Sequence, residues 1–225
     1  MQGLPDGASC GQPVWSPEGD ALLFISFPHR SASFSQMPQR LGIVYCFNRP
    51  CSLHAVPWPQ QSAGEAGQQL GGAAAVCLTP QLGSAFSPRF SPDGATLVFL
   101  SQQAAVNSGV HNATSSLHSL PWQHARAALS GGAAPPPRTV VDTVWLAPPE
   151  AFPGLYATAL PDQPFVGSQT LVLTTQWRSL SAVVAVNLQT GAVVRATPAN
   201  GASWALVAAG NGELASRWLA GVAGW

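Results

Sequence analysis

Histidines are the first side chains in this sequence to consider for chemistry. His111, His118 and His124 fall close together and could suggest a metal site. A zinc site needs closely spaced pairs of ligands, and the spacing of these three fits no metal-binding motif. Their surroundings are polar and typical of loops. We therefore interpret them as loop and strand-edge histidines, and we predict neither a metal site nor a cofactor.

The four cysteines are Cys10, Cys46, Cys51 and Cys77. Cys46 and Cys51 are separated by four residues, so they could form a redox pair or half of a zinc site. The other half is missing, because Cys10 and Cys77 each stand alone. The chain is also too long to resemble a small disulfide-stapled protein. We expect all four to be free thiols.

A serine nucleophile of the α/β-hydrolase type would require the motif G-x-S-x-G. The nearest match is Gly201-Ala202-Ser203-Trp204-Ala205, which lacks the closing glycine. Without that elbow no catalytic triad can be assigned. We assign no catalytic residue to this chain. The sequon Asn112-Ala113-Thr114 is interpreted as fortuitous, because no secretion signal accompanies it.

Composition narrows the range of partners. Of the 225 residues, 46% are hydrophobic and 8% are charged, and nine arginines balance nine acids to a net charge of zero. Such a surface gives no electrostatic reason to bind nucleic acid or anionic lipid. No apolar run is long enough for a membrane helix, and the N-terminus lacks the apolar core of a signal peptide. We expect a cytoplasmic location.

A tight turn occurs twice in nearly the same setting. Ser16-Pro17-Glu18-Gly19 returns as Ser91-Pro92-Asp93-Gly94, 75 positions later. Both sequences suit a type I turn, with Pro in the second place and Gly in the fourth. An aromatic residue precedes each turn, Trp15 or Phe90, and an apolar run follows it. Each copy therefore predicts a strand, a turn and a second strand.

The next strand repeats as well. "SLHAVPW" (residues 52–58) returns as "SLHSLPW" (residues 116–122), 64 positions later. His54 and His118 thus hold equivalent places, which favours a structural role for both. Trp58 and Trp122 are also equivalent. We expect the tryptophans to pack between neighbouring sheets instead of stacking on a ligand; the set comprises Trp15, Trp58, Trp122, Trp145 and Trp177.

Weaker copies follow. "FVGSQTLVLTTQW" (residues 165–177) resembles the earlier units, and "AVVAVNLQTGAVV" (residues 182–194) contains a hairpin turn at Leu188-Gln189-Thr190-Gly191. A fourth unit could turn at Gly210-Asn211-Gly212. The pattern predicts an all-β fold, either a β-solenoid or, as we favour, a partial β-propeller of three to four blades whose ring is not closed. The predicted units lie near 11–60, 85–125, 140–195 and possibly 200–214.

Three segments carry a family resemblance: "GQPVWSPEGDALLFISF", "RLGIVYCFNRPCSLH" (residues 40–54) and "SPRFSPDGATLVFLS". The sequence resembles the N-terminal β-propeller of acylaminoacyl-peptidase, also called acylamino-acid-releasing enzyme, of the prolyl oligopeptidase family. Arg40-Leu41-Gly42-Ile43, with Cys46 and Asn48-Arg49 between two such turns, is the most specific part. The resemblance extends from about residue 11 to 214, so 1–214 is interpreted as an incomplete propeller domain and 215–225 as a divergent tail.

The resemblance implies a function. Family members carry this propeller in front of an α/β-hydrolase domain with a Ser, Asp and His triad, and they release N-acylated amino acids from short blocked peptides. The propeller caps the active site and restricts entry. The chain is then a non-catalytic part of such a hydrolase, with a hydrolase domain in cis or a second copy of itself as partner.

Two alternatives remain at this stage. A stand-alone scaffold could use exposed loops to bind other proteins, and a TolB-like periplasmic module would need a signal peptide. A partial propeller leaves a blade face and strand edges open. We therefore expect the isolated chain to aggregate or to form oligomers.

Overall fold

The computed structural model describes residues 3–4, 6–28, 50–58, 74–108, 114–207 and 209, and the backbone of 219–220. Arg40 to Arg49, His111 to Ala113 and the turn at 210–212 lie outside the described residues. So do residues 29–39 and 59–73. The family-specific segment at 40–49, with Cys46, is therefore not placed, so the expectation of a free thiol at Cys46 stays a prediction.

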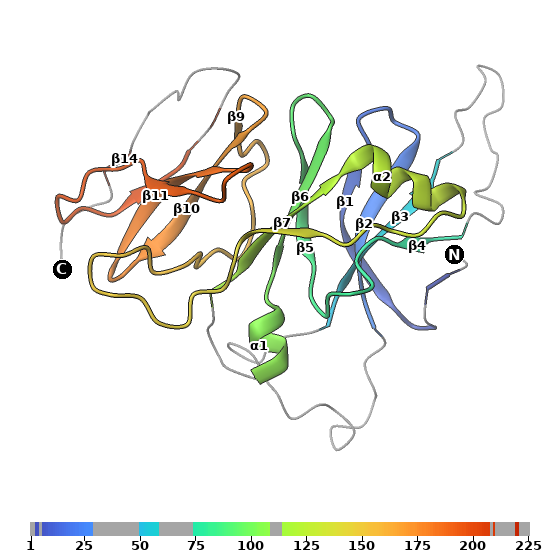
Figure 1. Ribbon diagram of the computed structural model, residues 1–225, viewed down its shortest axis with the longest axis horizontal. Coiled ribbons are helices and arrows are strands. Elements are labelled where there is room, and N and C mark those ends of the chain that lie inside the picture. The colour runs from blue at the N-terminus through green and yellow to red at the C-terminus, as the bar shows by residue number, and fades with distance from the viewer. Residues whose placement is uncertain are drawn as a thin grey trace.

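The described chain forms three four-stranded antiparallel sheets that stand side by side (Figure 1). The first, blade 1, contains β1 (Ser9–Trp15), β2 (Ala21–Phe27), β3 (Ser52–Pro57) and β4 (Val76–Cys77). Blade 2 contains β5 (Phe86–Phe90), β6 (Thr96–Ser101), β7 (Ser116–Pro121) and β8 (Arg138–Val141). Blade 3 contains β9 (Phe165–Val166), β10 (Thr170–Trp177), β11 (Leu180–Asn187) and β12 (Val193–Arg195).

In each blade the strands pair in sequence order, so each is an up-and-down meander. Side-by-side meanders of four strands are the blades of a β-propeller. A short two-stranded sheet follows, made of β13 (Trp204–Ala205) and β14 (Leu219–Ala220). The helices are short: α1 (Gln103–Ser108), α2 (Trp122–Ala127) and the 3₁₀ turn η3 (Ala128–Ser130). The predictions of an all-β fold and of a partial propeller with an open ring are confirmed.

The fourth strands of the first two blades lie beyond the units expected from the sequence. β4 follows residue 60, and β8 follows residue 125. Val140 and Val141 therefore belong to the second sheet, although the third unit was expected to begin near 140. Both strands are short and come after long connections, one of which contains α2 and η3. Such strands carry little alternation that a sequence pattern could reveal.

The repeated turns form as predicted. The Gly19 N–H donates to the Ser16 carbonyl at 2.9 Å, and the Gly94 N–H donates to the Ser91 carbonyl at 2.8 Å. Both glycines have positive φ, +71° and +70°, which glycine adopts without steric cost. Each serine hydroxyl also accepts a hydrogen bond from the backbone at the start of the next strand. Both turns, β1–β2 and β5–β6, point to the top of Figure 1.

Strand alternation builds the core between the blades. Leu23 and Ile25 of β2 face blade 2, where they join a cluster with Leu97 and Phe99 of β6. The intervening residues of β6 face the other way, and they join a second cluster with residues of β10 and β11. Because side chains alternate along a strand, each blade packs on both neighbours. None of the helices in the described ranges has the length and apolar character that a membrane span requires.

Candidate functional site at the first strands of the blades

The first strands of blades 1 and 2 carry a bulge at the same place. The register shifts between Gly11 and Val14 in β1, and between Phe86 and Arg89 in β5. Gln12 inside the first bulge and Ser87 inside the second both have positive φ, 51° and 56°. Left-handed backbone at a residue other than glycine costs on the order of 1 kcal/mol. The contacts of these two residues account for the conformation.

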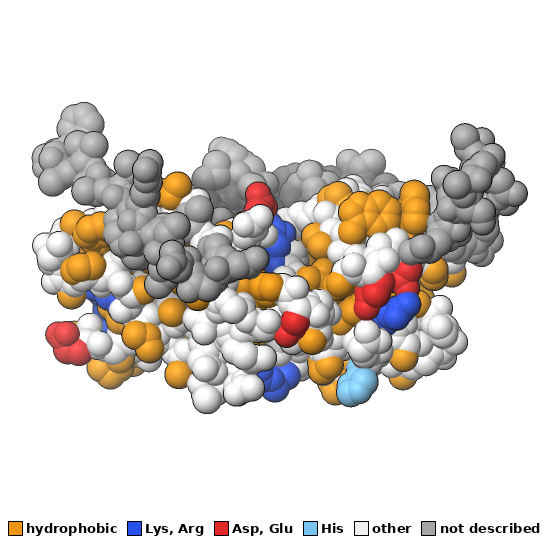
Figure 2. Space-filling model, turned by 90° about the horizontal axis from the view of Figure 1, so that it is seen from above, with side chains coloured by type: hydrophobic (Ala, Val, Ile, Leu, Met, Phe, Trp, Pro, Cys, Tyr) orange, Lys and Arg blue, Asp and Glu red, His pale blue; other side chains and the backbone are white. Residues whose placement is uncertain are grey.

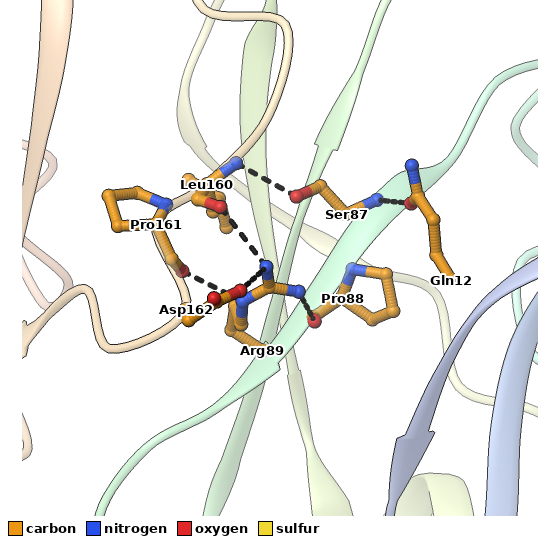
Figure 3. Close-up of polar contacts among 7 residues, drawn as sticks. All are labelled: Gln12, Ser87, Pro88, Arg89, Leu160, Pro161 and Asp162. Carbon is orange, nitrogen blue, oxygen red and sulfur yellow. Dashed lines mark hydrogen bonds and ion pairs between the residues drawn. The ribbon is translucent and has the colours of Figure 1, made fainter.

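The two bulge residues link three blades (Figure 3). The Ser87 backbone N–H donates to Oε1 of Gln12 at 2.6 Å, which joins blade 2 to blade 1. The Ser87 hydroxyl accepts a hydrogen bond from the Leu160 N–H at 2.8 Å, which joins blade 2 to the segment that leads into β9. Ser87 is buried. The bulges thus fix the spacing of the first strands.

Arg89 adds a second link to the same segment. Its guanidinium donates to the carbonyl of Pro161 at 2.7 Å, to that of Leu160 at 3.2 Å, and to that of Pro88 at 2.8 Å. It also forms an ion pair with Asp162 at 2.9 Å (Figure 3). The Asp162 side chain is 99% exposed, so this pair contributes little to stability. The two contacts with the carbonyls of Leu160 and Pro161 are the ones that hold the segment in place.

A pocket of about 310 Å³ lies next to this link. Its walls combine aromatic rings, prolines and polar side chains; they are Phe90, Pro92, Asp162, Gln163, Pro164, Phe165 and Ala209. Ligand sites begin at about 300 Å³, and they are lined mainly by apolar groups with a few polar ones. The pocket is therefore large enough for one peptide side chain. It lies where β5 ends and β9 begins.

Ser116 and His118 form a close Ser–His pair in blade 2. Ser116 Oγ lies 2.9 Å from Nε2 of His118, and Thr139 Oγ1 lies 3.4 Å from Nδ1. Both Ser116 and His118 are buried, at 4% and 6% exposure, inside the sheet of blade 2. A nucleophile has to reach a substrate. This pair is a packing element, and burial lowers the pKa of His118 below its usual value.

The repeat supports that conclusion. His54, the equivalent residue of blade 1, is 7% exposed and contacts the carbonyl of Ser52 through Nδ1 at 3.2 Å. Each histidine stacks on the phenylalanine opposite it, His54 on Phe24 at 5.9 Å and His118 on Phe99 at 5.5 Å. The interplanar angles are 15° and 13°. The same arrangement in two blades is structural, as the sequence suggested.

The other candidate residues are scattered. His124 is exposed on α2, away from His118, and Ser203 accepts a hydrogen bond from the Ser181 N–H at 3.2 Å. Within the described ranges no three His, Cys, Asp or Glu side chains come together as a metal site. Cys10, Cys51 and Cys77 are free thiols. Burial raises the pKa of the Cys51 thiol, which therefore stays protonated.

Four of the five predicted tryptophans pack against another aromatic ring, and Trp145 lies exposed. Trp122 packs edge-on against Phe90 at 5.0 Å and is fully buried, and Trp177 packs against Phe152 at 5.6 Å. Trp58 and Trp15 form an edge-on pair at 5.0 Å, with Trp15 half exposed. The expectation that Trp145 packs between sheets is wrong. It is 70% exposed, because it lies in the long connection between β8 and β9 and not in a strand.

The link through Gln12, Ser87 and Arg89 was not predicted from the sequence. A signal existed, since residues 12 and 87 are 75 positions apart, the same offset as the two turns. The residues themselves differ, so the equivalence becomes visible only through the backbone conformation. The segment 160–162 carries no motif at all.

These features define a class of protein: a β-propeller domain whose described blades form an open arc. Residues 1–217 match the family described as the N-terminal domain of acylamino-acid-releasing enzyme. The chain belongs to this family.

Full-length relatives agree. Acylamino-acid-releasing enzyme 1 of Oryza sativa subsp. japonica is 37% identical over 88% of this chain, and the enzyme of Arabidopsis thaliana is 36% identical over 89%. The enzyme of Rattus norvegicus is 30% identical over 92%. The matched part is 26%, 25% and 24% of these three proteins. The chain therefore spans about a quarter of the length of the curated relatives it matches.

A solved structure shows the same fold. A puromycin-hydrolysing peptidase of Mycobacterium tuberculosis superposes with a TM-score of 0.51 at 16% identity, over 91% of this chain and 25% of that one. At this identity the likeness concerns the fold alone.

Proposed function

We propose that this chain is the propeller part of a serine hydrolase that releases N-acylated amino acids from short blocked peptides. The observation that carries the proposal is the family match over residues 1–217, together with relatives whose names state this activity. Catalysis then belongs to a hydrolase domain carried in the same polypeptide. The role of the propeller is to gate the access of peptides to that domain.

The linked first strands support a gating role. The bond between Gln12 and Ser87 joins the first strands of blades 1 and 2, and the bond between Ser87 and Leu160 joins blade 2 to the segment that leads into blade 3. β1 of blade 1 contacts β5 of blade 2, so these strands converge. We call these linked first strands the rim of the propeller opening. A rigid rim keeps that opening narrow, and a narrow opening admits short unfolded peptides but not folded proteins.

Enzyme assay of the native protein tests the proposal. An antibody against the exposed segment 142–149 captures the polypeptide from extracts of the source cells, and the captured material is incubated with a short N-acetylated peptide. We expect release of the N-acetylated amino acid, and we expect a fluorophosphonate, which reacts with activated serines, to abolish it. Captured protein that has no such activity contradicts the proposal.

A rim variant tests gating separately from catalysis. In the full-length polypeptide, Gln12→Ala removes the acceptor for the Ser87 N–H without touching a catalytic group. We expect the rate for a short acylated peptide to stay unchanged and the rate for a long one to rise. Equal rates for both lengths, before and after the substitution, would show that the rim does not select substrates.

A further inference from the structure

We propose that the Trp15–Trp58 pair of blade 1 is the docking site for an acidic β-turn that belongs to a further blade of the same polypeptide. The inference rests on the proposed function, because only a longer polypeptide can supply that blade. It goes beyond the proposed function by naming where the ring closes on blade 1 and what chemistry the partner surface has.

The contact between blades 1 and 2 shows how such a turn docks. The turn of blade 1 lies on the tryptophan of blade 2: Trp122 Nε1 donates to Oε2 of Glu18 at 2.9 Å. Gln123 donates to the other carboxylate oxygen at 3.3 Å. Pro17 packs so closely on Gly94 that an added Cβ there would lie 2.8 Å from the proline ring. Carboxylate, proline and indole together make this contact specific.

Blade 1 presents the same receiving surface. Trp58 is equivalent to Trp122, and Trp15 is equivalent to Phe90. The two ring pairs have the same geometry, with centroids 5.0 Å apart in both and interplanar angles of 88° and 80°. The surroundings differ, because Trp58 is only partly buried where Trp122 is fully buried, and Trp15 is 50% exposed where Phe90 is partly buried. Within the described residues no carboxylate accepts a hydrogen bond from the Trp58 indole.

Hydrophobic side chains are visible over blade 1 on the turn side of the molecule, beside acidic and basic ones (Figure 2). The charged groups at the neighbouring interface include Glu18 and the ion pair of Asp20 with Arg126. A half-exposed tryptophan paired with a partly buried one, beside an existing blade contact, is the kind of surface that a partner covers.

The linker before blade 1 follows the same plan as the linker before blade 2. Leu78, just after β4, belongs to the cluster that contains Phe99 of blade 2. Leu4, 74 positions earlier, packs on the cluster that contains Phe24 of blade 1, and Phe24 is equivalent to Phe99. The face of blade 1 that points away from blade 2 is therefore organised like a face that meets another blade.

The chemistry of the occupant follows from the two turns of this chain. Each has proline in its second place and an acidic residue, Glu18 or Asp93, in its third. A hydrogen bond from an indole N–H to a carboxylate is stronger than one between neutral groups. We infer that the docking turn has a carboxylate that accepts from Nε1 of Trp58 and a proline that packs on Gly19, the equivalent of Gly94, beside which the described residues leave open space.

Hydroxyl-radical footprinting read by mass spectrometry tests the inference at single residues. In the 225-residue chain we expect rapid oxidation of Trp15, and in the full-length polypeptide we expect oxidation several-fold slower. Trp122 should resist oxidation in both. Trp58→Phe, which removes the donor and keeps an aromatic ring, should restore the oxidation of Trp15 in the full-length polypeptide only. The matched control Trp145→Phe, on the exposed loop, should leave Trp15 unchanged in both.

The other possible outcomes separate a failure of this inference from a failure of the proposed function. A full-length polypeptide that hydrolyses acylated peptides while Trp15 is oxidised as fast as in the short chain overturns this inference and leaves the proposed function standing. Protection of Trp15 in the 225-residue chain that grows with protein concentration means that a second copy occupies the site. That also overturns the inference. If the source cells contain no polypeptide longer than 225 residues, both this inference and the proposed function are overturned.

Discussion

Blades 1 and 2 are built on one sequence frame but have different surroundings. The turns, the stacked His–Phe pairs and the edge-on aromatic pairs recur in both. Trp122 of blade 2 lies beneath a turn of blade 1 and is fully buried, whereas Trp58, its equivalent in blade 1, is only partly buried. The repeat determines the conformation of each blade, and the neighbouring blade determines how deeply each residue is buried.

The largest effect on stability is expected when equivalent leucines of the two blades are replaced. Leu97 of β6 is fully buried against blade 1, and Leu22 of β2, its equivalent, is only partly buried. Leu97→Ala should lower the free energy of unfolding by about 2–5 kcal/mol, the usual cost of emptying a core site. Leu22→Ala should cost less than half as much. Urea unfolding of both variants measures the difference, and equal losses would contradict the claim that blade 1 lacks a neighbour on that side.

The next test concerns the link between blades 2 and 3. Arg89→Met keeps much of the apolar stem and removes the donors to Leu160 and Pro161. We expect a loss of about 1–3 kcal/mol in urea unfolding, because the abandoned carbonyls are only partly accessible to water. Arg178→Met is the matched control. Its guanidinium also donates to backbone carbonyls, but on an exposed loop, so its loss should be much smaller. Similar losses for the two variants would argue against a special role for Arg89.

A smaller effect is expected at the contact between blades 1 and 2. Glu18→Gln keeps the shape of the side chain and removes the charge that accepts the Trp122 N–H. Since Glu18 is exposed, the loss should be below about 1 kcal/mol. A double-mutant cycle with Trp122→Phe isolates the bond. If the losses of unfolding free energy in the two single variants add strictly, the bond contributes nothing. The contact on which the docking surface at Trp58 is based would then give no support to that inference.

The smallest effect is a pH dependence shared by both blades. Burial lowers the pKa of His54 and of His118, so the folded chain binds fewer protons than the unfolded chain. The stability they contribute is complete above the unfolded pKa of about 6.5 and falls as the pH drops from there toward the lowered folded pKa. Urea midpoints at pH 7.5 and 5.5 measure the change, and His54→Asn with His118→Asn should reduce it. A midpoint that rises toward pH 5.5 would reverse the sign and contradict the assignment.

Much of the fold was accessible from the sequence because it repeats. The two Ser-Pro-x-Gly turns and the two "SLH" strands predicted three of the four strands in each of the first two blades. The fourth strands were missed, since β4 has two residues and β8 follows a helix. Trp145 was misjudged because its residue type favours burial, while burial depends on a neighbour that this loop does not have.

The candidate site was harder to predict than the fold. Gln12 and Ser87 are unremarkable polar residues, and their importance lies in backbone conformation and in partners 75 and 73 positions away. Arg89 contacts carbonyls, which every residue has, so no motif points to them. Hydrogen bonds to the backbone across blades leave no pattern in a single sequence.

The most direct test of the central claim is the mass of the native polypeptide. An antibody against residues 142–149 on a denaturing blot of source-cell extract reports it in one step. If the three blades are part of the ring of a longer hydrolase, the band lies several-fold above the 23.3 kDa of this chain. A single band near 23.3 kDa would contradict the account and leave the chain as a short protein with open blades.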